Sequence, residues 1–123
     1  SIKQAVNLYT QTAADWEKLN EPQRAVFCLT ETAKLAQMYS DYKTAFRVLE
    51  KAIKLATDHN LLEEKIISSS LYSLYALEKS DKKNAQKYSE QAISLSKKAS
   101  SAKAKAYSFF CKGMYEYYYG KMK

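Results

Sequence analysis

The chain has 123 residues, of which 46% are apolar and 27% charged, with two glycines, one proline and a formal net charge of +7. This length suits one domain with a core, and the scarcity of strand and turn formers excludes a β-rich fold. Because neither a run of roughly 18 apolar residues nor a signal-peptide pattern occurs, we expect a soluble, cytoplasmic protein.

Six helices are predicted, separated by short polar breaks. They span residues 2–18, 22–39, 42–57, 61–79, 82–98 and 102–119. Pro22 suits the first turn of the second helix, where no backbone N–H is required. Asp41 and Asp81 are good N-cap residues for the third and fifth helices, and Asn60 is expected in the turn before the fourth. The chain is therefore predicted to be all-α.

The sequence repeats itself after 40 residues. The stretch AFRVLEKAIKLA (45–56) aligns with AQKYSEQAISLS (85–96), and five residues are identical. Small residues also recur at two places, which are Ala33, Ser73 and Gly113 for the first and Ser40, Ser80 and Gly120 for the second. Helices that approach closely need a small residue at the contact, and a turn needs a residue that ends the helix. We therefore expect close packing at the first set and turns at the second.

This pattern resembles the tetratricopeptide repeat, a helical hairpin with the signature W-x2-L-G-x2-Y, A-x3-F and P. The stretch DYKTAFRVLEKAIKLA (41–56) lies closest to that signature, and Ala33, Ala45 and Leu49 stand at signature places. The Trp and Pro of the signature are absent from their places in these repeats, and the period of 40 residues is long. In both respects the chain is similar to long-helix members of the family, such as the SNAP adaptors and the repeat domains of bacterial peptide-sensing regulators. The resemblance implies a right-handed α-solenoid of antiparallel helix hairpins.

The repeat divides one predicted domain into four pieces. Residues 21–59 and 60–99 form two full repeats, while 1–20 is the second helix of an incomplete repeat and 100–123 the first helix of another. The chain is thus out of phase with its own repeat, and we expect it to be a fragment of a longer array.

A partner-binding surface follows from the resemblance. In a solenoid of helix pairs, the first helices line the concave wall. Its candidate residues are Phe27, Lys34, Met38, Ile67, Leu74, Leu77, Tyr107, Phe110, Met114, Tyr117 and Tyr118. Such an apolar, aromatic wall suits an amphipathic helix or an extended peptide, although the same residues also suit a core that a neighbouring repeat fills. Family members that clamp a carboxylate carry several basic residues here, and only Lys34 fits that role.

Positive charge is concentrated in the last third of the chain. Residues 79–123 hold eleven Lys and three acidic residues, whereas residues 1–78 hold nine Lys/Arg and ten Asp/Glu. Such a field attracts nucleic acid, an anionic membrane or an acidic protein, but lysines also solvate ordinary helix faces. The candidate basic patch consists of Lys82, Lys83, Lys87, Lys97, Lys98, Lys103 and Lys105. A third alternative is self-association through exposed repeat ends.

No catalytic or metal site is predicted. Cys28 and Cys111 lack ligand spacing and are interpreted as buried, reduced thiols, and His59 has no relay partner. Ser68–Ser70 lie on a helix without a nucleophile elbow, and Trp16 is interpreted as a core residue. We therefore expect a non-enzymatic interaction module or scaffold without a cofactor, whose partner is a protein or peptide, helical and carrying acidic residues.

Overall fold

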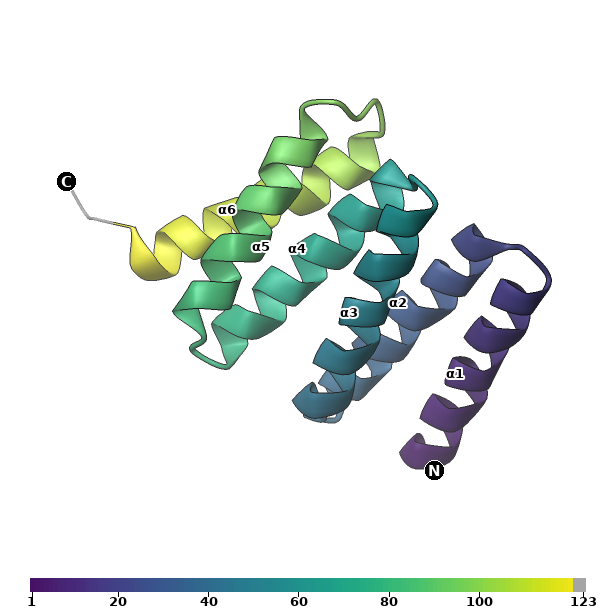
Figure 1. Cartoon of the computed structure of the whole chain (residues 1–123). Helices are drawn as coiled ribbons and strands as arrows, with labels where there is room; N and C mark the ends of the chain where they lie inside the picture. Colours follow the sequence, from purple (N-terminus) through teal and green to yellow (C-terminus); the bar gives the residue numbers. More distant parts are fainter. Residues whose placement is uncertain (121–123) are drawn as a thin grey trace. The chain divides into compact units, whose positions relative to one another are not determined.

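A computed structural model describes residues 1–120, and within that range all regular structure is helical (Figure 1). The helices are α1 (Ile2–Lys18), α2 (Pro22–Met38), α3 (Tyr42–Asp58), α4 (Leu62–Glu78), α5 (Lys82–Ser96) and α6 (Ala102–Tyr119). The predicted all-α class and the six predicted helices are confirmed over the described residues. The largest difference is at the end of α5, which stops at Ser96 instead of residue 98 because a turn begins at Lys97.

Four helix ends share one backbone conformation. Asn20, Ser40, Asn60 and Ser80 have positive φ angles of 58°, 62°, 55° and 59°, in the left-handed region that closes many helices. At each of these ends, the N–H of the following residue bonds to the carbonyl five residues before it, as from Asp41 to Ala36 at 2.8 Å. The equal spacing of these turns gives α2, α3 and α4 the same length of 17 residues.

The residues after these turns start the next helices as predicted. The carboxylates of Asp41 and Asp81 accept the backbone N–H of Thr44 at 3.1 Å and of Asn84 at 3.2 Å, which confirms both N-caps. Pro22 occupies the first turn of α2. The predicted breaks therefore come from local chemistry, in which a left-handed turn is followed by a residue that satisfies the free N–H groups of a new helix.

The chain divides into two compact units, Ser1–Glu64 and Lys65–Lys123. The division lies in the first turn of α4, whereas the repeat predicted limits after residues 20, 59 and 99. The units are called unit 1 and unit 2.

Unit 1 has an aliphatic core around α2, which packs against α1 and α3. Leu29 of α2 and Leu49 of α3 are fully buried, and each such side chain contributes about 1.5–3 kcal/mol by leaving water. Ala33 and Ala45 are also fully buried. Their small side chains are what a close approach of two helices requires, so the predicted small-residue place is occupied as expected in this unit.

Unit 2 has a more polar core. Ser68, Ser69, Ser70 and Ser73 of α4 are all fully buried, and α5 packs against α6. The Ser73 hydroxyl donates to the Ala85 carbonyl of α5 at 2.7 Å. A side chain that is both small and able to donate therefore joins α4 to α5 at the place where unit 1 uses Ala33.

Only one of the two glycines has its predicted role. Gly113 was expected at a close helix contact, but it is exposed, and a Cβ added there meets nothing within 4 Å. Gly120 was expected where a helix ends and turns, and it does end α6, although its φ is −69° and not positive as in Ser40 and Ser80. Its lack of a side chain is used differently, since a Cβ would collide with the Glu116 carbonyl.

Candidate functional site

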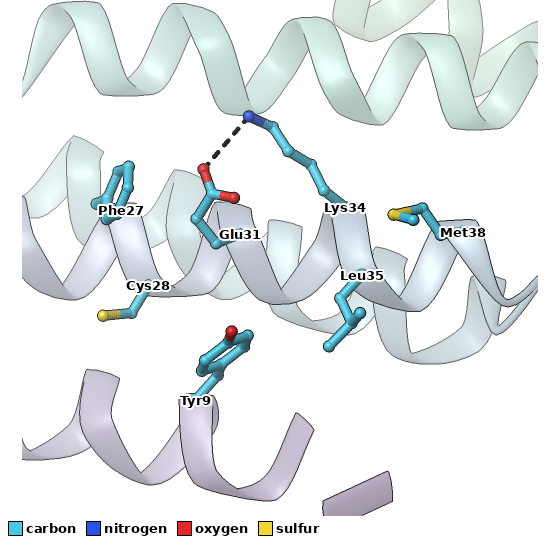
Figure 2. Close-up of a pocket in the computed structure, with 7 residues that line it drawn as sticks. All are labelled: Tyr9, Phe27, Cys28, Glu31, Lys34, Leu35 and Met38. Carbon is cyan, nitrogen blue, oxygen red and sulfur yellow. Dashed lines mark hydrogen bonds and ion pairs between the residues drawn. The ribbon is translucent and has the colours of Figure 1, made fainter. Parts of the chain in front are cut away.

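An open groove of about 500 Å³ lies between α1 and α2 of unit 1. Figure 2 shows the residues that line it, with Tyr9 contributed by α1 and the others by α2. These residues are Tyr9, Phe27, Cys28, Glu31, Lys34, Leu35 and Met38. The volume lies in the range of about 300–1,000 Å³ that is usual for ligand sites.

The helical period places the α2 residues along two parallel rows. Phe27, Glu31, Lys34 and Met38 follow the spacing of one helix face, and Cys28 and Leu35 lie two turns apart on the adjacent row. In Figure 2 the Tyr9 ring projects from α1 toward α2, where Cys28 and Leu35 project back toward it. Tyr9 thus faces Cys28 and Leu35 from the other side of the groove.

Three large side chains of this groove remain in water. Tyr9 is 45% exposed, Phe27 60% and Met38 71%. Covering such side chains releases about 25 cal/mol for each Å² of apolar surface removed from water. Tyr and Met also make adaptable contacts, because the phenol has a polar end and the thioether chain is flexible. The groove therefore offers binding free energy to an apolar ligand that reaches it.

The polar residues of the groove balance each other in charge. The Lys34 ammonium lies 3.4 Å from the Glu31 carboxylate, and both side chains are partly exposed. An ion pair of this kind adds little stability. It does leave the middle of the groove without net charge, while the side-chain stems of both residues extend the apolar surface.

A second hollow continues from Phe27 and Cys28 toward the start of α2. It is lined by these two residues together with Trp16, Glu21, Gln23 and Arg24. The Arg24 guanidinium lies 4.8 Å from the centre of the Trp16 ring, a cation–π contact. Trp16 is half-buried, so the residue interpreted as core also presents surface to this hollow.

The Cys28 thiol lies between the two hollows. It is half-buried, which differs from the expected full burial. Burial raises the pKa of Cys28, and this outweighs a hydrogen bond with Trp16 that lowers it. The group is therefore a neutral thiol near pH 7, which suits apolar packing better than nucleophilic chemistry.

The groove contains three of the residues that the sequence analysis assigned to the wall, which are Phe27, Lys34 and Met38. Tyr9 was not predicted there, because only the first helix of each pair was assigned to the wall. A signal for it exists in the repeat, where Tyr9 takes the place of the fully buried Leu49. A phenol at the place of a buried leucine indicates a partly wet position.

The predicted wall residues of unit 2 are found in three environments. Phe110, Tyr117 and Tyr118 are exposed, whereas Ile67, Leu74, Tyr107 and Met114 are half-buried. Leu77 is buried. A partner can reach the first set directly, while Leu77 belongs to the packing of the folded chain.

The candidate basic patch separates into two groups. Lys82, Lys83 and Lys87 lie in the first half of α5, and the second group follows at its other end. The second group consists of Lys97, Lys98, Lys103 and Lys105. Lys105 is half-buried and the other six lysines are exposed. Since α5 has 15 residues and rises about 1.5 Å per residue, the two groups lie roughly 20 Å apart.

Among residues 1–120, no three His, Cys, Asp or Glu side chains are grouped so that they can hold a metal ion. No helix in this same range is long and apolar enough to span a bilayer. Neither protein-family models, nor curated proteins, nor solved structures gave a match to the chain.

Proposed function

We propose that the chain is a non-catalytic protein-interaction module of the tetratricopeptide type, whose hairpins form a right-handed solenoid. The equal spacing of the four left-handed turns supports a repeated hairpin. We further propose that the α1/α2 groove binds an apolar helix or peptide. The observation that carries this proposal is the exposure of Tyr9, Phe27 and Met38 around one open groove.

The groove suits a segment of polypeptide better than a compact small molecule. It is open along α2, and its two hollows share Phe27 and Cys28. A helix that presents apolar residues at positions i, i+3, i+4 and i+7 can place them along such a surface. The positive charge that would attract acidic residues on this helix lies in unit 2, since residues 1–64 have a net charge of −1 and residues 65–123 one of +8.

A designed peptide tests the groove. The probe is a fluorescent helix of about 18 residues, with Leu on one face and Glu on the other, and its anisotropy reports binding. Phe27→Ala and Met38→Ala are each expected to raise the Kd roughly 5–30-fold, because exposed anchors at an interface centre contribute about 1–2 kcal/mol. Circular dichroism should stay unchanged, since both side chains project into water.

The matched control is Leu19→Ala. Leu19 is 67% exposed and lies outside both hollows, so its removal deletes similar apolar surface elsewhere. Equal losses in Leu19→Ala and Phe27→Ala would show non-specific adhesion and overturn the proposal. Unchanged affinity in both groove variants would overturn it as well.

The rival function is binding of nucleic acid or an anionic membrane through the two lysine groups. The charge of unit 2 favours it, since residues 65–123 hold twelve Lys and four acidic residues. Salt separates the two functions. Contacts to phosphates weaken steeply as ionic strength rises, whereas binding through apolar burial changes little.

A further inference from the structure

The connection between α5 and α6 differs from the other four connections between helices. Each of those has three residues and contains one residue with a positive φ, which is Asn20, Ser40, Asn60 or Ser80. The α5/α6 connection has five residues, 97–101, and none of them has a positive φ. A chain that follows one local rule repeatedly and breaks it once tends to do so at a functional position.

This connection is also strongly basic. It reads KKASS, and residues 91–115 around it contain five lysines and no acidic residue. Lys97 and Lys98 stand three and two positions before Ser100, and no other serine or threonine of the chain has a basic residue at both places. Serine/threonine kinases that select basic substrates recognise such lysines through acidic residues of their own.

Ser100 is accessible in the folded chain, whereas the next serine already has a structural role. Ser100 is exposed and lies outside the helices. Ser101 is half-buried and caps α6, because its side chain accepts the Ala104 N–H at 3.1 Å. Exposure is a property of this turn in every repeat, since Asn60 and Asn20, the residues 40 and 80 positions earlier, are exposed as well. An enzyme can therefore reach Ser100 without unfolding a helix.

We propose that Ser100 is a phosphorylation site for a serine/threonine kinase that recognises basic residues. In the transfer, the Ser100 Oγ forms a bond to the γ-phosphorus of a nucleoside triphosphate, and the bond from that phosphorus to the leaving nucleoside diphosphate breaks. The hydroxyl proton passes to a carboxylate of the kinase. Residues 97–100 bind the kinase as an extended segment, and this opens only a turn because α5 ends at Ser96.

The phosphate has two consequences for unit 2. It carries about −1.5 to −2 charges at pH 7, which offsets roughly half of the positive charge of the four lysines between residues 97 and 105. It also lies two residues before α6, whose first turn contains no acidic residue. Negative charge at this end of a helix is favoured by the helix dipole and by hydrogen bonds from free N–H groups. Phosphorylation therefore stabilises the start of α6.

Treatment of the folded chain with ATP and the catalytic subunit of cyclic-AMP-dependent protein kinase tests the site. Mass spectrometry should find one phosphoryl group per chain, on Ser100. Ser100→Ala should abolish the transfer, while Ser101→Asn should retain it, because Asn keeps the cap of α6 without a hydroxyl. Lys97→Ala and Lys98→Ala should each lower kcat/KM for this substrate at least about tenfold. Lys103→Ala, which removes a lysine after the serine, is the matched control and should change kcat/KM by less than about threefold.

Cys111 of α6 reports the effect of the phosphate on unit 2. Its thiol is fully buried, so its alkylation under native conditions requires local opening. The phosphorylated chain should be alkylated about 2–5-fold more slowly than the unmodified chain. High salt should reduce this difference, because it screens the interaction of the phosphate with the helix end and the lysines.

Four outcomes would overturn the proposal. The kinase leaves the folded chain unmodified, or Lys97→Ala and Lys98→Ala are modified as fast as Lys103→Ala. Ser100 and Ser108 are modified equally, which would show that the kinase acts on unfolded chains, because Ser108 is fully buried. Phosphorylation leaves the alkylation of Cys111 at low salt unchanged or accelerates it. Groove binding is a separate property of unit 1, and Ser100→Ala should leave the Kd of the designed peptide unchanged.

Discussion

Units 1 and 2 use the same backbone repeat with different interiors. Leu49 fills a fully buried place in unit 1, and the equivalent residue in unit 2 is Ser89, also fully buried. Likewise, Ala33 in one unit corresponds to Ser73 in the other. The contacts between these helices therefore require small or well-fitted side chains. A buried serine is tolerated there where its hydroxyl donates a hydrogen bond to an acceptor.

The two cysteines allow each unit to be followed separately. Cys28 belongs to unit 1 and is half-buried, while Cys111 is fully buried in unit 2. Burial raises the pKa of the Cys111 thiol, which outweighs hydrogen bonds with Ser70 and Ser73 that lower it. Alkylation of Cys111 under native conditions therefore reports the opening of unit 2, and variants of single units can be compared through it.

The largest expected effect is in the aliphatic core. Leu49→Ala should lower the free energy of unfolding by about 2–5 kcal/mol, because it removes buried surface and leaves a cavity. Ser89→Ala at the equivalent place should change it by less than about 1 kcal/mol, since the Ser89 hydroxyl only bonds to the Gln86 carbonyl of its own helix. Urea denaturation measures both, and equal losses would show that the two interiors do not differ as described.

The second effect concerns a hydroxyl of α4 without a partner. The Ser68 Oγ is buried and makes no hydrogen bond, so Ser68→Ala should stabilise unit 2 by about 1–2 kcal/mol through removal of a desolvated polar group. Ser89→Ala is the control, because the buried Ser89 hydroxyl does have a partner and donates to the Gln86 carbonyl at 3.1 Å. Slower alkylation of Cys111 in Ser68→Ala alone is the expected result, and faster alkylation would contradict it.

The third effect compares the left-handed turns. Ser40 and Ser80 adopt positive φ angles, which disfavour a residue with a Cβ by roughly 1–2 kcal/mol. Ser40→Gly and Ser80→Gly should each stabilise by up to about 1 kcal/mol, because part of the relieved strain is offset by the entropy of a glycine in the unfolded chain. Asn60→Gly should gain less, since Asn tolerates this conformation better. Melting temperatures in one buffer rank the three variants, and a loss in Ser80→Gly would argue against the turn described.

The smallest effect depends on pH. Hydrogen bonds from Thr44 lower the pKa of Asp41, so its carboxylate stabilises the fold above the unfolded pKa of about 3.9. That contribution is lost as pH falls through the lower pKa of the folded state. Asp41→Asn keeps the cap without the charge, and the loss at neutral pH should be only a few tenths of a kcal/mol at this exposed site. The free energies of unfolding of the two proteins should therefore differ near pH 7 and converge near pH 2.

Most of the fold could be predicted from the sequence, because it depends on local interactions. The six helices, the N-caps Asp41 and Asp81, and the turns at Ser40, Asn60 and Ser80 depend on residues within a few positions of each other. The end of α5 was less clear, because residues 97–101 lack a left-handed turn residue like Ser40 or Ser80. The groove was predicted only in part, since Tyr9 enters it from a helix that the resemblance assigned to the other side.

The sequence by itself determined where helices begin and end, the spacing of their turns and the places of small residues, because these follow from backbone conformation and short-range hydrogen bonds. The tertiary structure decided which small residue is covered. Ala33, Ser73 and Gly113 are equivalent along the chain, yet the first two are fully buried and Gly113 is exposed. Burial depends on neighbours that are distant in sequence, so the exposure of Gly113 was visible only once the helices were packed.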